Sequence, residues 1–288
     1  MRFPGDIFDI FEVTFKFMIP LNFESSGSGR PLLALHGYGA SLFSWRHLPL
    51  ALPDRRVIRI DFPGHGRSPP RLDDRYRLAD HALAVLEFIE TQGLQEFDLV
   101  GHSIGGGVAL MIAVDFMERR RNSIRSLTLV DSLALPQRIP WLLRPAFSPR
   151  LGPFVMSLLP PRLIVRAVLR FAFYDSRRIT EEMVRIYAKN LESGEGRHAS
   201  LETARQMIPG DLMEMIEKYR QLTLPALLIW GRRDRIVPPA IGIELNALIQ
   251  GSKLILIDDC GHVPQEERPD ITLGAIADFL SRVSPIVL

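Results

Sequence analysis

The chain has 288 residues, of which 47% are hydrophobic and 24% are charged, a balance typical of globular proteins and not of disordered or fibrous ones. Its formal net charge of +2 is too small to favour nucleic-acid binding. The single cysteine, Cys260, excludes an internal disulfide, and no cluster of cysteines and histidines has the spacing of a zinc site. We therefore expect one large domain, or a domain with an insertion, without metal.

The beginning of the chain carries Asp6, Asp9 and Glu12 within an apolar stretch, unlike the basic and then apolar layout of a secretory signal. We expect the mature protein to begin near Met1. No run of 18 or more uncharged apolar residues is present, so the sequence predicts no transmembrane span. A cytoplasmic protein is the expectation, and the sequence indicates no particular oligomeric state.

Short apolar runs along the chain predict about eight strands. Residues 11–17 alternate apolar and polar side chains, which is typical of a half-buried strand, and a second strand is predicted over residues 19–24. Continuous apolar runs, which suit strands buried on both faces of a parallel sheet, occupy residues 32–35, 57–60, 97–100, 127–130, 226–230 and 254–257.

Helical spacing of apolar residues fills the gaps between these strands, over residues 78–89, 108–116 and 271–283. Alternating strands and helices predict an α/β fold with a mostly parallel, doubly wound sheet. After Asp131 the alternation stops until about residue 223. We interpret residues 133–222 as an inserted, mainly helical cap, and residues 1–132 and 223–288 as the core domain.

The sharpest motif is Gly101-His102-Ser103-Ile104-Gly105, between the strand at 97–100 and the helix that follows. In a strand–turn–helix of this kind the central residue adopts a strained backbone conformation, and the flanking glycines avoid clashes with the neighbouring strand and helix. The helix N-terminus adds free N–H groups and partial positive charge. We predict Ser103 as a nucleophile.

A second motif, His36-Gly37-Tyr38-Gly39, follows the strand at 32–35. Acyl transfer needs two N–H donors aimed at the oxyanion, one after the nucleophile and one from a loop beyond an adjacent strand. The backbone N–H groups of Ile104 and Tyr38 fit these two positions. Alone this motif would indicate only a turn, but paired with Ser103 it predicts an oxyanion hole.

A serine nucleophile needs a base, and seven histidines are candidates. We select His262, which follows the strand at 254–257 and should lie where the carboxyl edge of a parallel sheet collects ligands. The glycine-rich surroundings of three other histidines indicate structural roles, and the remaining three are typical of solvated or helix-surface positions. The three histidines with glycine-rich surroundings are His36, His65 and His102, and the other three are His47, His81 and His198.

An acid must hold the base in the correct tautomer. Asp234 comes after the strand at 226–230 and gives the chain order serine, aspartate, histidine that this architecture uses. Asp131, at the end of the strand at 127–130, is a rival at the same edge of the sheet. We favour Asp234, and interpret Asp258 and Asp259 as ordinary loop residues.

Together these motifs resemble the α/β-hydrolase family, over nearly the whole chain apart from the cap. The loop at 61–68 (DFPGHGRS) resembles the segment after the family's fourth strand, and residues 261–264, with Glu267 and Pro269 after them, resemble the loop of its catalytic histidine. Haloalkane dehalogenases and epoxide hydrolases carry Asp in place of Ser103, so the resemblance disfavours their chemistries.

The resemblance implies a carboxylic ester hydrolase that acts through an acyl-enzyme on Ser103, without a cofactor, on a small-molecule acyl substrate. Monoacylglycerol lipases, thioesterases and carbon–carbon bond hydrolases remain open. Carbon–carbon hydrolases often carry Trp after the catalytic histidine, where this chain has Val263, which weakens that alternative. A ligand receptor or scaffold with little turnover also stays open, since a fold alone never proves catalysis.

The predicted cap is unusually basic and apolar in its first half. No acidic residue lies between Asp131 and Asp175, and the arginines of that stretch are spread through aromatic and aliphatic sequence. These apolar side chains either pack the cap onto the core or line an acyl pocket. Such a segment could also lie against an anionic membrane surface, so peripheral membrane contact through the cap stays open.

Overall fold

A computed structural model describes residues 19–283 and contains one sheet of seven strands. The strands are β1 (Phe23–Ser26), β2 (Arg30–Leu35), β3 (Arg55–Ile60), β4 (Phe97–His102), β5 (Ile124–Val130), β6 (Ala226–Gly231) and β7 (Lys253–Ile257). All six predicted buried strands are present, and each extends its apolar run by one to three residues. The predicted strand at 11–17 lies outside the described residues.

The sheet has the order β1-β3-β2-β4-β5-β6-β7. Neighbouring strands run parallel except for β1, which pairs antiparallel with β3, with Phe23 opposite Ile60. The strand predicted over 19–24 is displaced, since β1 begins only at Phe23. An edge strand that pairs on one side leaves most of its residues exposed, so the apolar pattern marks its bounds poorly.

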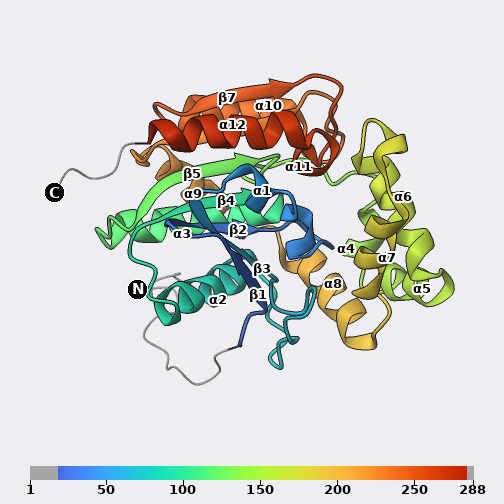
Figure 1. Ribbon diagram of the computed structural model, residues 1–288. Helices are drawn as coiled ribbons and strands as arrows, with labels where there is room; N and C mark the ends of the chain where they lie inside the picture. Colours follow the sequence, from blue (N-terminus) through green and yellow to red (C-terminus); the bar gives the residue numbers. More distant parts are fainter. Residues whose placement is uncertain (1–18, 284–288) are drawn as a thin grey trace.

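Helices cover both faces of the sheet (Figure 1). Side chains alternate along β6, so that Leu228 and Trp230 belong to one core cluster and Leu227 and Ile229 to the other. The first cluster includes residues of α2 (Leu78–Thr91), α3 (Ile104–Glu118) and α10 (Pro239–Leu248), and the second includes residues of α1 (Leu48–Ala51) and α12 (Pro269–Arg282). The fold is therefore a doubly wound, three-layer α/β structure.

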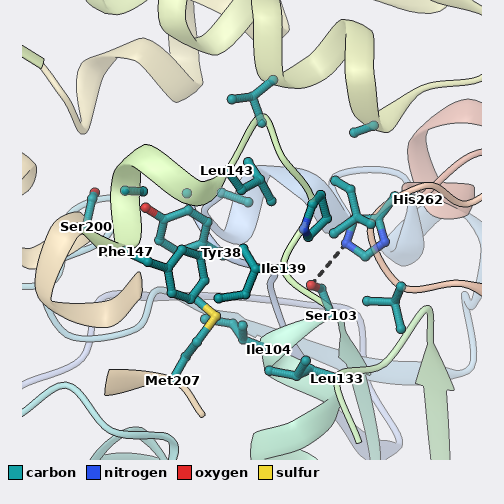
Figure 2. A pocket seen from close by; sticks show the side chains of 18 of the residues that line it. Tyr38, Ser103, Ile104, Leu133, Ile139, Leu143, Phe147, Ser200, Met207 and His262 are labelled. Carbon is teal, nitrogen blue, oxygen red and sulfur yellow. Dashed lines mark hydrogen bonds between the residues drawn. The ribbon is translucent and has the colours of Figure 1, made fainter. Parts of the chain in front are cut away.

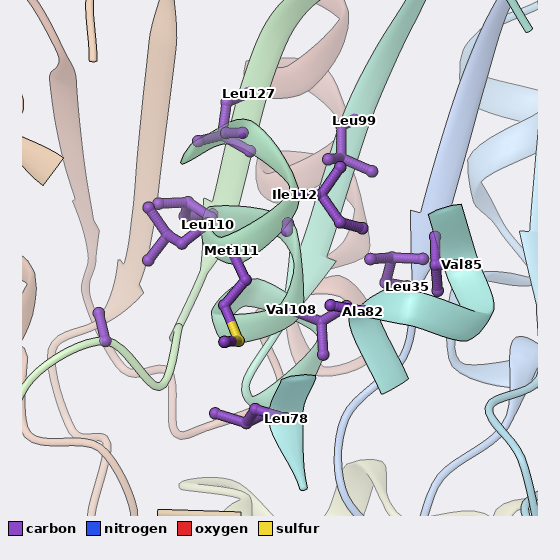
Figure 3. Close-up of a cluster of buried hydrophobic side chains, with 14 of the residues drawn as sticks. Leu35, Leu78, Ala82, Val85, Leu99, Val108, Leu110, Met111, Ile112 and Leu127 are labelled. Atoms are coloured by element: carbon purple, nitrogen blue, oxygen red, sulfur yellow. The ribbon is translucent and has the colours of Figure 1, made fainter. Parts of the chain in front are cut away.

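Helix α3 lies against the middle of the sheet, with α2 beside it (Figure 3). Its residues from Ile104 to Phe116 are buried on every side, as expected of a helix that is apolar all round. Val108 and Ile112 pack in the same cluster as Leu35 and Leu99 of the neighbouring strands. This packing fixes the N-terminus of α3 directly beyond the end of β4.

Residues 131–225, between β5 and β6, are termed the β5–β6 segment. Its helices are α4 (Arg144–Phe147), α5 (Leu151–Leu158), α6 (Pro161–Ala172), the 3₁₀ turn η3 (Ser176–Arg178), α7 (Glu181–Lys189), α8 (Gly194–Gln206) and α9 (Leu212–Tyr219). Helices α5, α6 and α7 lie beyond the carboxyl ends of the strands (Figure 1). Across residues 19–283, no helix has the length and apolarity needed to cross a membrane.

Three histidines are buried together beneath the loops that follow β2 and β3. The ring centroid of His65 lies 5.6 Å from that of His36 and 6.1 Å from that of His81. Burial lowers the pKa of His36 and of His65 to about 4 and holds the pKa of His81 well below its ordinary value. The expectation that His81 is solvated was therefore wrong, because it lies on the buried side of α2 between Leu78 and Val85.

These buried histidines should make the fold acid-sensitive. Above pH 6.5 these histidines are neutral in both the folded and the unfolded chain. Below pH 6.5 they become protonated in the unfolded chain but not in the folded one, so the free energy of unfolding falls. Neither ring nitrogen of His81 has a hydrogen-bond partner among the described residues. We expect His81→Leu to raise the free energy of unfolding at pH 5 by about 1 to 2 kcal/mol more than at pH 7.5.

Urea unfolding at both pH values measures this difference. The matched control is His198→Leu, because His198 is exposed on α8 beside Asp74 and should show no comparable gain at pH 5. An equal effect of the two substitutions would contradict the proposed cause.

Candidate active site

Ser103 occupies a strained turn between β4 and α3. Its φ of 55° and ψ of −119° lie in a region that residues other than glycine rarely adopt. A Cβ at Gly101 would lie 2.2 Å from the carbonyl oxygen of Gly105, and a Cβ at Gly105 would lie 2.5 Å from the carbonyl oxygen of His36. Both glycines are therefore required by close backbone packing, which holds the Ser103 side chain above the sheet.

The three side chains predicted as a triad meet at the carboxyl ends of β4, β6 and β7. His262 Nε2 lies 3.0 Å from Ser103 Oγ (Figure 2). His262 Nδ1 lies 2.7 Å from Asp234 Oδ2. Because the Asp234 carboxylate accepts, Nδ1 carries the proton and Nε2 presents its lone pair to the Ser103 hydroxyl. All three residues are buried. This arrangement can remove a proton from serine.

Asp234 is fixed by the backbone that follows it. Its Oδ1 accepts hydrogen bonds from the N–H of Ile236 at 2.7 Å and of Val237 at 3.1 Å, which leaves Oδ2 for His262. The carboxylate is therefore oriented toward the imidazole before any substrate arrives.

Asp131, the rival acid, lies beside this pair but makes no hydrogen bond to His262. One of its oxygens accepts from the Gly231 N–H at 3.0 Å, and the other has no partner among the described residues. Burial, and then the charge of Asp234, raise the pKa of the Asp131 carboxyl well above its ordinary value. Asp131 therefore favours its protonated form more strongly than an ordinary aspartate does, whereas Asp234 is the acid that faces the imidazole.

Asp131, Asp234 and His262 are also the one group within residues 19–283 whose ligand atoms lie close enough to hold a metal ion, within 4.8 Å of one another. Two of these atoms already bond to each other, since His262 Nδ1 donates to Asp234. The hydrogen bonds of the group are those of a serine–histidine–aspartate arrangement.

The two N–H groups predicted as an oxyanion hole lie near Ser103. Ile104 is the first residue of α3, so its N–H has no carbonyl partner within the helix. Tyr38 follows Gly37, where a Cβ would lie 3.2 Å from the Cβ of Ser103, so the backbone of this turn passes close to the hydroxyl. Both Tyr38 and Ile104 line the same cavity as Ser103.

The loop motifs on either side of this turn hold it in place. His36 Nε2 accepts the N–H of Phe62 at 3.0 Å, and its Nδ1 donates to the Gly37 carbonyl at 2.8 Å. Asp61 accepts from the backbone of Leu42 at 2.7 Å and of Arg67 at 2.9 Å. The glycine-rich motifs after β2 and β3 therefore join two loops, and His36 has the structural role expected of it.

The loop of His262 is tied to the β5–β6 segment by backbone bonds. The His262 N–H donates to the Ala172 carbonyl at 2.8 Å. The carboxylate of Glu267, fully buried in α11 (Pro264–Glu267), accepts from the N–H groups of Gly261 at 2.7 Å, Tyr174 at 3.2 Å and Asp175 at 2.6 Å. One buried side chain thus joins the histidine loop to the chain just after α6.

A cavity of about 490 Å³ opens on Ser103 and His262, a size typical of small-molecule sites. Figure 2 shows Tyr38, Phe147 and Met207 extending from Ser103 on the side away from His262, toward Ser200. Most of the lining is aliphatic, and much of it comes from the β5–β6 segment. None of the described lining residues is a lysine or arginine.

The sequence analysis did not find two polar residues that line this cavity. The Tyr187 hydroxyl of α7 donates to Glu266 at 2.7 Å, and Arg46 also donates to the Glu266 carboxylate. Burial raises the pKa of Glu266, although Arg46 opposes the shift. Neither residue belongs to a local motif, because Tyr187 and Arg46 are brought to Glu266 only by the packing of α7 on the core.

Comparison with known proteins agrees with this fold and site. A family model described as the alpha/beta hydrolase fold matches residues 30–269, which is most of the chain. The chain therefore belongs to the α/β-hydrolase fold family, and it is a hydrolase by fold and by the names of its relatives. The fold class expected from the sequence is confirmed.

Named relatives have more than one activity. A 2-hydroxymuconate semialdehyde hydrolase of Pseudomonas sp. is 29% identical over 91% of this chain and 91% of the relative. A thermophilic esterase of Thermogutta terrifontis is 26% identical with a TM-score of 0.76, covering 95% of this chain and 97% of that one. A 2-hydroxy-6-oxo-6-phenylhexa-2,4-dienoate hydrolase of Rhodococcus sp. has a TM-score of 0.79 at 22% identity, covering 92% and 96%.

The raised pKa of Asp131 predicts a pH-dependent cost to folding. When the pKa of an acid is raised in the folded chain, the free energy of unfolding falls as the pH rises above the acid's pKa in the unfolded chain, which is near 4. The reason is that the unfolded chain loses this proton more readily than the folded chain does. Asp131→Asn removes this cost and keeps an oxygen for the Gly231 N–H. We expect a higher melting temperature than wild type at pH 7 and no gain at pH 4.

Differential scanning calorimetry at both pH values gives the comparison. Asp258→Asn serves as the control, because Asp258 is exposed and paired with Arg232. A gain for Asp131→Asn that is as large at pH 4 as at pH 7 would show that the cost is not one of ionisation.

Proposed function

We propose that this chain is a serine hydrolase that cleaves carboxylic esters of apolar acids, with Ser103, His262 and Asp234 as its catalytic residues. The observation that carries the proposal is the apolar cavity that opens directly on the hydrogen-bonded Ser103–His262 pair. The nucleophile, base and acid support acyl transfer, and the lining supports a substrate with an uncharged hydrocarbon part. The proposed site requires no cofactor.

In the proposed first step, Ser103 Oγ attacks the ester carbonyl carbon while its proton passes to His262 Nε2. The carbonyl oxygen becomes an oxyanion that accepts hydrogen bonds from the backbone N–H groups of Tyr38 and Ile104, and Asp234 stabilises the imidazolium. The tetrahedral intermediate collapses when His262 gives its proton to the leaving alkoxide, and the alcohol departs. An acyl-enzyme on Ser103 remains.

In the second step, His262 takes a proton from water, and the resulting hydroxide attacks the acyl carbon. The same two N–H groups hold the second oxyanion. His262 then returns a proton to Ser103 Oγ, the acyl–oxygen bond breaks, and the carboxylic acid is released. Asp131 takes no proton in this scheme, because it makes no hydrogen bond to the imidazole.

The β5–β6 segment has the role of a cap in this proposal. Its side chains Leu143, Phe147, Met156, Ile164 and Met207 line the cavity, and they would surround the acyl chain and exclude water from the site. We propose the same division as the sequence indicated, with residues 133–222 as cap and the rest as core. The substrate class then depends on the cap and the reaction on the core.

Carbon–carbon bond hydrolysis is the second candidate, since relatives are named as 2-hydroxymuconate semialdehyde and phenylhexa-2,4-dienoate hydrolases. A dienoate carries a carboxylate, which a buried site must pair with a cation or several donors. The described lining residues include no lysine or arginine, and their one carboxylate is Glu266. The cavity therefore favours a neutral ester over an anionic dienoate.

A substrate panel tests this order. On p-nitrophenyl esters from acetate to octanoate, kcat/KM should rise about fourfold per added methylene until the cavity is filled, since each buried methylene contributes about 0.8 kcal/mol. Hydrolysis of 2-hydroxy-6-oxo-6-phenylhexa-2,4-dienoate should be at least a hundredfold slower. A strict preference for acetate, or faster cleavage of the dienoate, would overturn the ester proposal.

The catalytic roles predict an unequal effect of two aspartate substitutions. Asp234→Asn should lower kcat by about 10⁴, because an amide facing His262 Nδ1 favours the wrong tautomer, whereas Asp131→Asn should lower it less than tenfold. Steady-state kinetics on the best ester gives the comparison, with Ser103→Ala, expected to lose about 10⁴ to 10⁶, as the reference. The reverse ranking of the two aspartates would refute the assignment.

Fluorophosphonate labelling of the same proteins distinguishes an enzyme from a receptor or scaffold. Wild type and Asp131→Asn should label at Ser103 and Ser103→Ala should not. A wild-type protein that binds esters but stays unlabelled would favour a binding role.

A further inference from the structure

The charge of the chain is divided unevenly between the first half of the β5–β6 segment and everything else. Residues 132–174 contain six arginines and no aspartate, glutamate, lysine or histidine, a formal charge of +6. Because the whole chain carries +2, the other residues together carry −4. The molecule is therefore polarised, and its cationic end will turn toward an anionic surface.

The same stretch exposes apolar side chains along one side of a helix. Leu151, Phe154 and Leu158 of α5 recur at spacings of three and four residues, and 47%, 58% and 63% of their respective surfaces are exposed. Leu163, near the start of α6, is 55% exposed. Single exposed leucines are ordinary, but a contiguous apolar patch on a protein surface marks an interaction site.

Cationic side chains are exposed on α6, the next helix along the chain. Arg162, Arg166 and Arg170 recur every four residues along one side of α6, next to the side that buries Val165, Leu169 and Ala172. Arg166 pairs with Glu181, whereas Arg162 and Arg170 have no carboxylate within ion-pair distance among the described residues. We term Leu151, Phe154, Leu158, Arg162, Leu163 and Arg170 the α5–α6 outer face.

The inner sides of these two helices line the cavity through Val155, Met156, Ile164 and Val168. Leu159, in the turn between them, both lines the cavity and is 46% exposed. The helices lie at the end of the molecule, beyond the carboxyl ends of the strands (Figure 1). A single helical layer thus separates the outer face from the candidate active site.

We propose that the α5–α6 outer face docks on the surface of anionic phospholipid bilayers. An apolar face flanked by arginines is the arrangement by which an amphipathic helix settles at a bilayer interface, with its apolar side chains among the acyl chains and its cations at the phosphates. Charge complementarity selects this partner, because an uncharged or cationic surface gives the arginines no counterion. Docking there places the cavity next to the membrane, from which apolar substrates would enter.

Vesicle co-sedimentation of the full chain tests the docking, with Ser103→Ala so that binding is read without hydrolysis. The protein should bind vesicles of phosphatidylcholine and phosphatidylglycerol at a 7:3 ratio, bind pure phosphatidylcholine at least tenfold more weakly, and lose most of the difference in 0.5 M salt. Phe154→Gln with Leu158→Gln should weaken binding about tenfold or more. Arg162→Gln with Arg170→Gln should weaken it about 25-fold, since each arginine contributes about fivefold.

Matched controls keep the test specific to this surface. Leu50→Gln with Leu72→Gln removes two leucines of the core domain that are even more exposed, at 85% and 93%. Arg121→Gln with Arg282→Gln removes the same net charge from the core domain, near the C-terminal ends of α3 and α12, where both arginines are exposed and paired. Both control pairs should bind like the parent protein.

Absence of binding to the mixed vesicles, or equal weakening by the control pairs, would overturn the proposal. So would a dimer, measured by light scattering, that the outer-face substitutions convert to monomer in a protein without vesicle affinity, because the face would then be an interface between copies. Turnover of a soluble short-chain ester, measured with Ser103 intact, is a separate readout. Its loss would contradict the proposed hydrolase and leave the docking result unaffected.

Discussion

The whole site depends on one backbone conformation, the positive φ of Ser103. A residue with a Cβ keeps such a conformation only when its surroundings leave no alternative, and here β4, α3 and the loop after β2 together provide that restraint. The carbonyl oxygens of Gly105 and His36 lie where any side chain at Gly101 or Gly105 would have to go. The burial of α3 between the sheet and α2 stabilises the fold and at the same time sets the direction of the Ser103 hydroxyl.

The remaining parts of the site follow from the order of the strands. Strand β4 lies in the middle of the sheet, between β2 and β5, with β6 and β7 beyond β5. These strands run parallel, so the loops that follow them open at one edge. The loop after β2 brings Tyr38, the loop after β6 brings Asp234, and the loop after β7 brings His262. The Asp131 carboxyl lies beside Asp234, where burial and then the charge of Asp234 raise the pKa of Asp131, while two backbone N–H donors orient the Asp234 carboxylate.

Much of this could be predicted from the sequence, because the signals were local. Continuous apolar runs mark strands buried on both faces, and the glycines around Ser103 mark a turn that admits no other residue. The positions of Asp234 and His262 relative to strand ends were enough to bring them to one edge of a parallel sheet. Their catalytic roles remain predictions, since the structure gives geometry and the comparisons give the family.

What could not be predicted depends on contacts between distant segments. His81 has the helical spacing of a buried residue, but its polarity suggested solvent, and only the packing of α2 against the loops after β2 and β3 decides between them. The bounds of β1 were displaced because an edge strand has a weak apolar pattern. The partners of Glu266 and Glu267 lie about 80 to 220 residues away in the chain, at Tyr187, Tyr174 and Arg46, and no spacing rule connects them.

The bonds from Glu267 and Ala172 to the histidine loop have a consequence for how such a segment can diversify. The chain just after α6 is fastened to the core at the catalytic histidine, whereas α4 and α5 precede that fastening point. Lengthening, shortening or exchanging the residues before α6 should thus leave the positions of Ser103, His262 and Asp234 unchanged. Changes within residues 172–175 would displace the loop that carries His262. The hydrogen bonds of Glu267 and Ala172 thus divide the inserted segment in two. The residues before α6 can change with the ligands or surfaces that the protein binds, whereas residues 172–175 cannot.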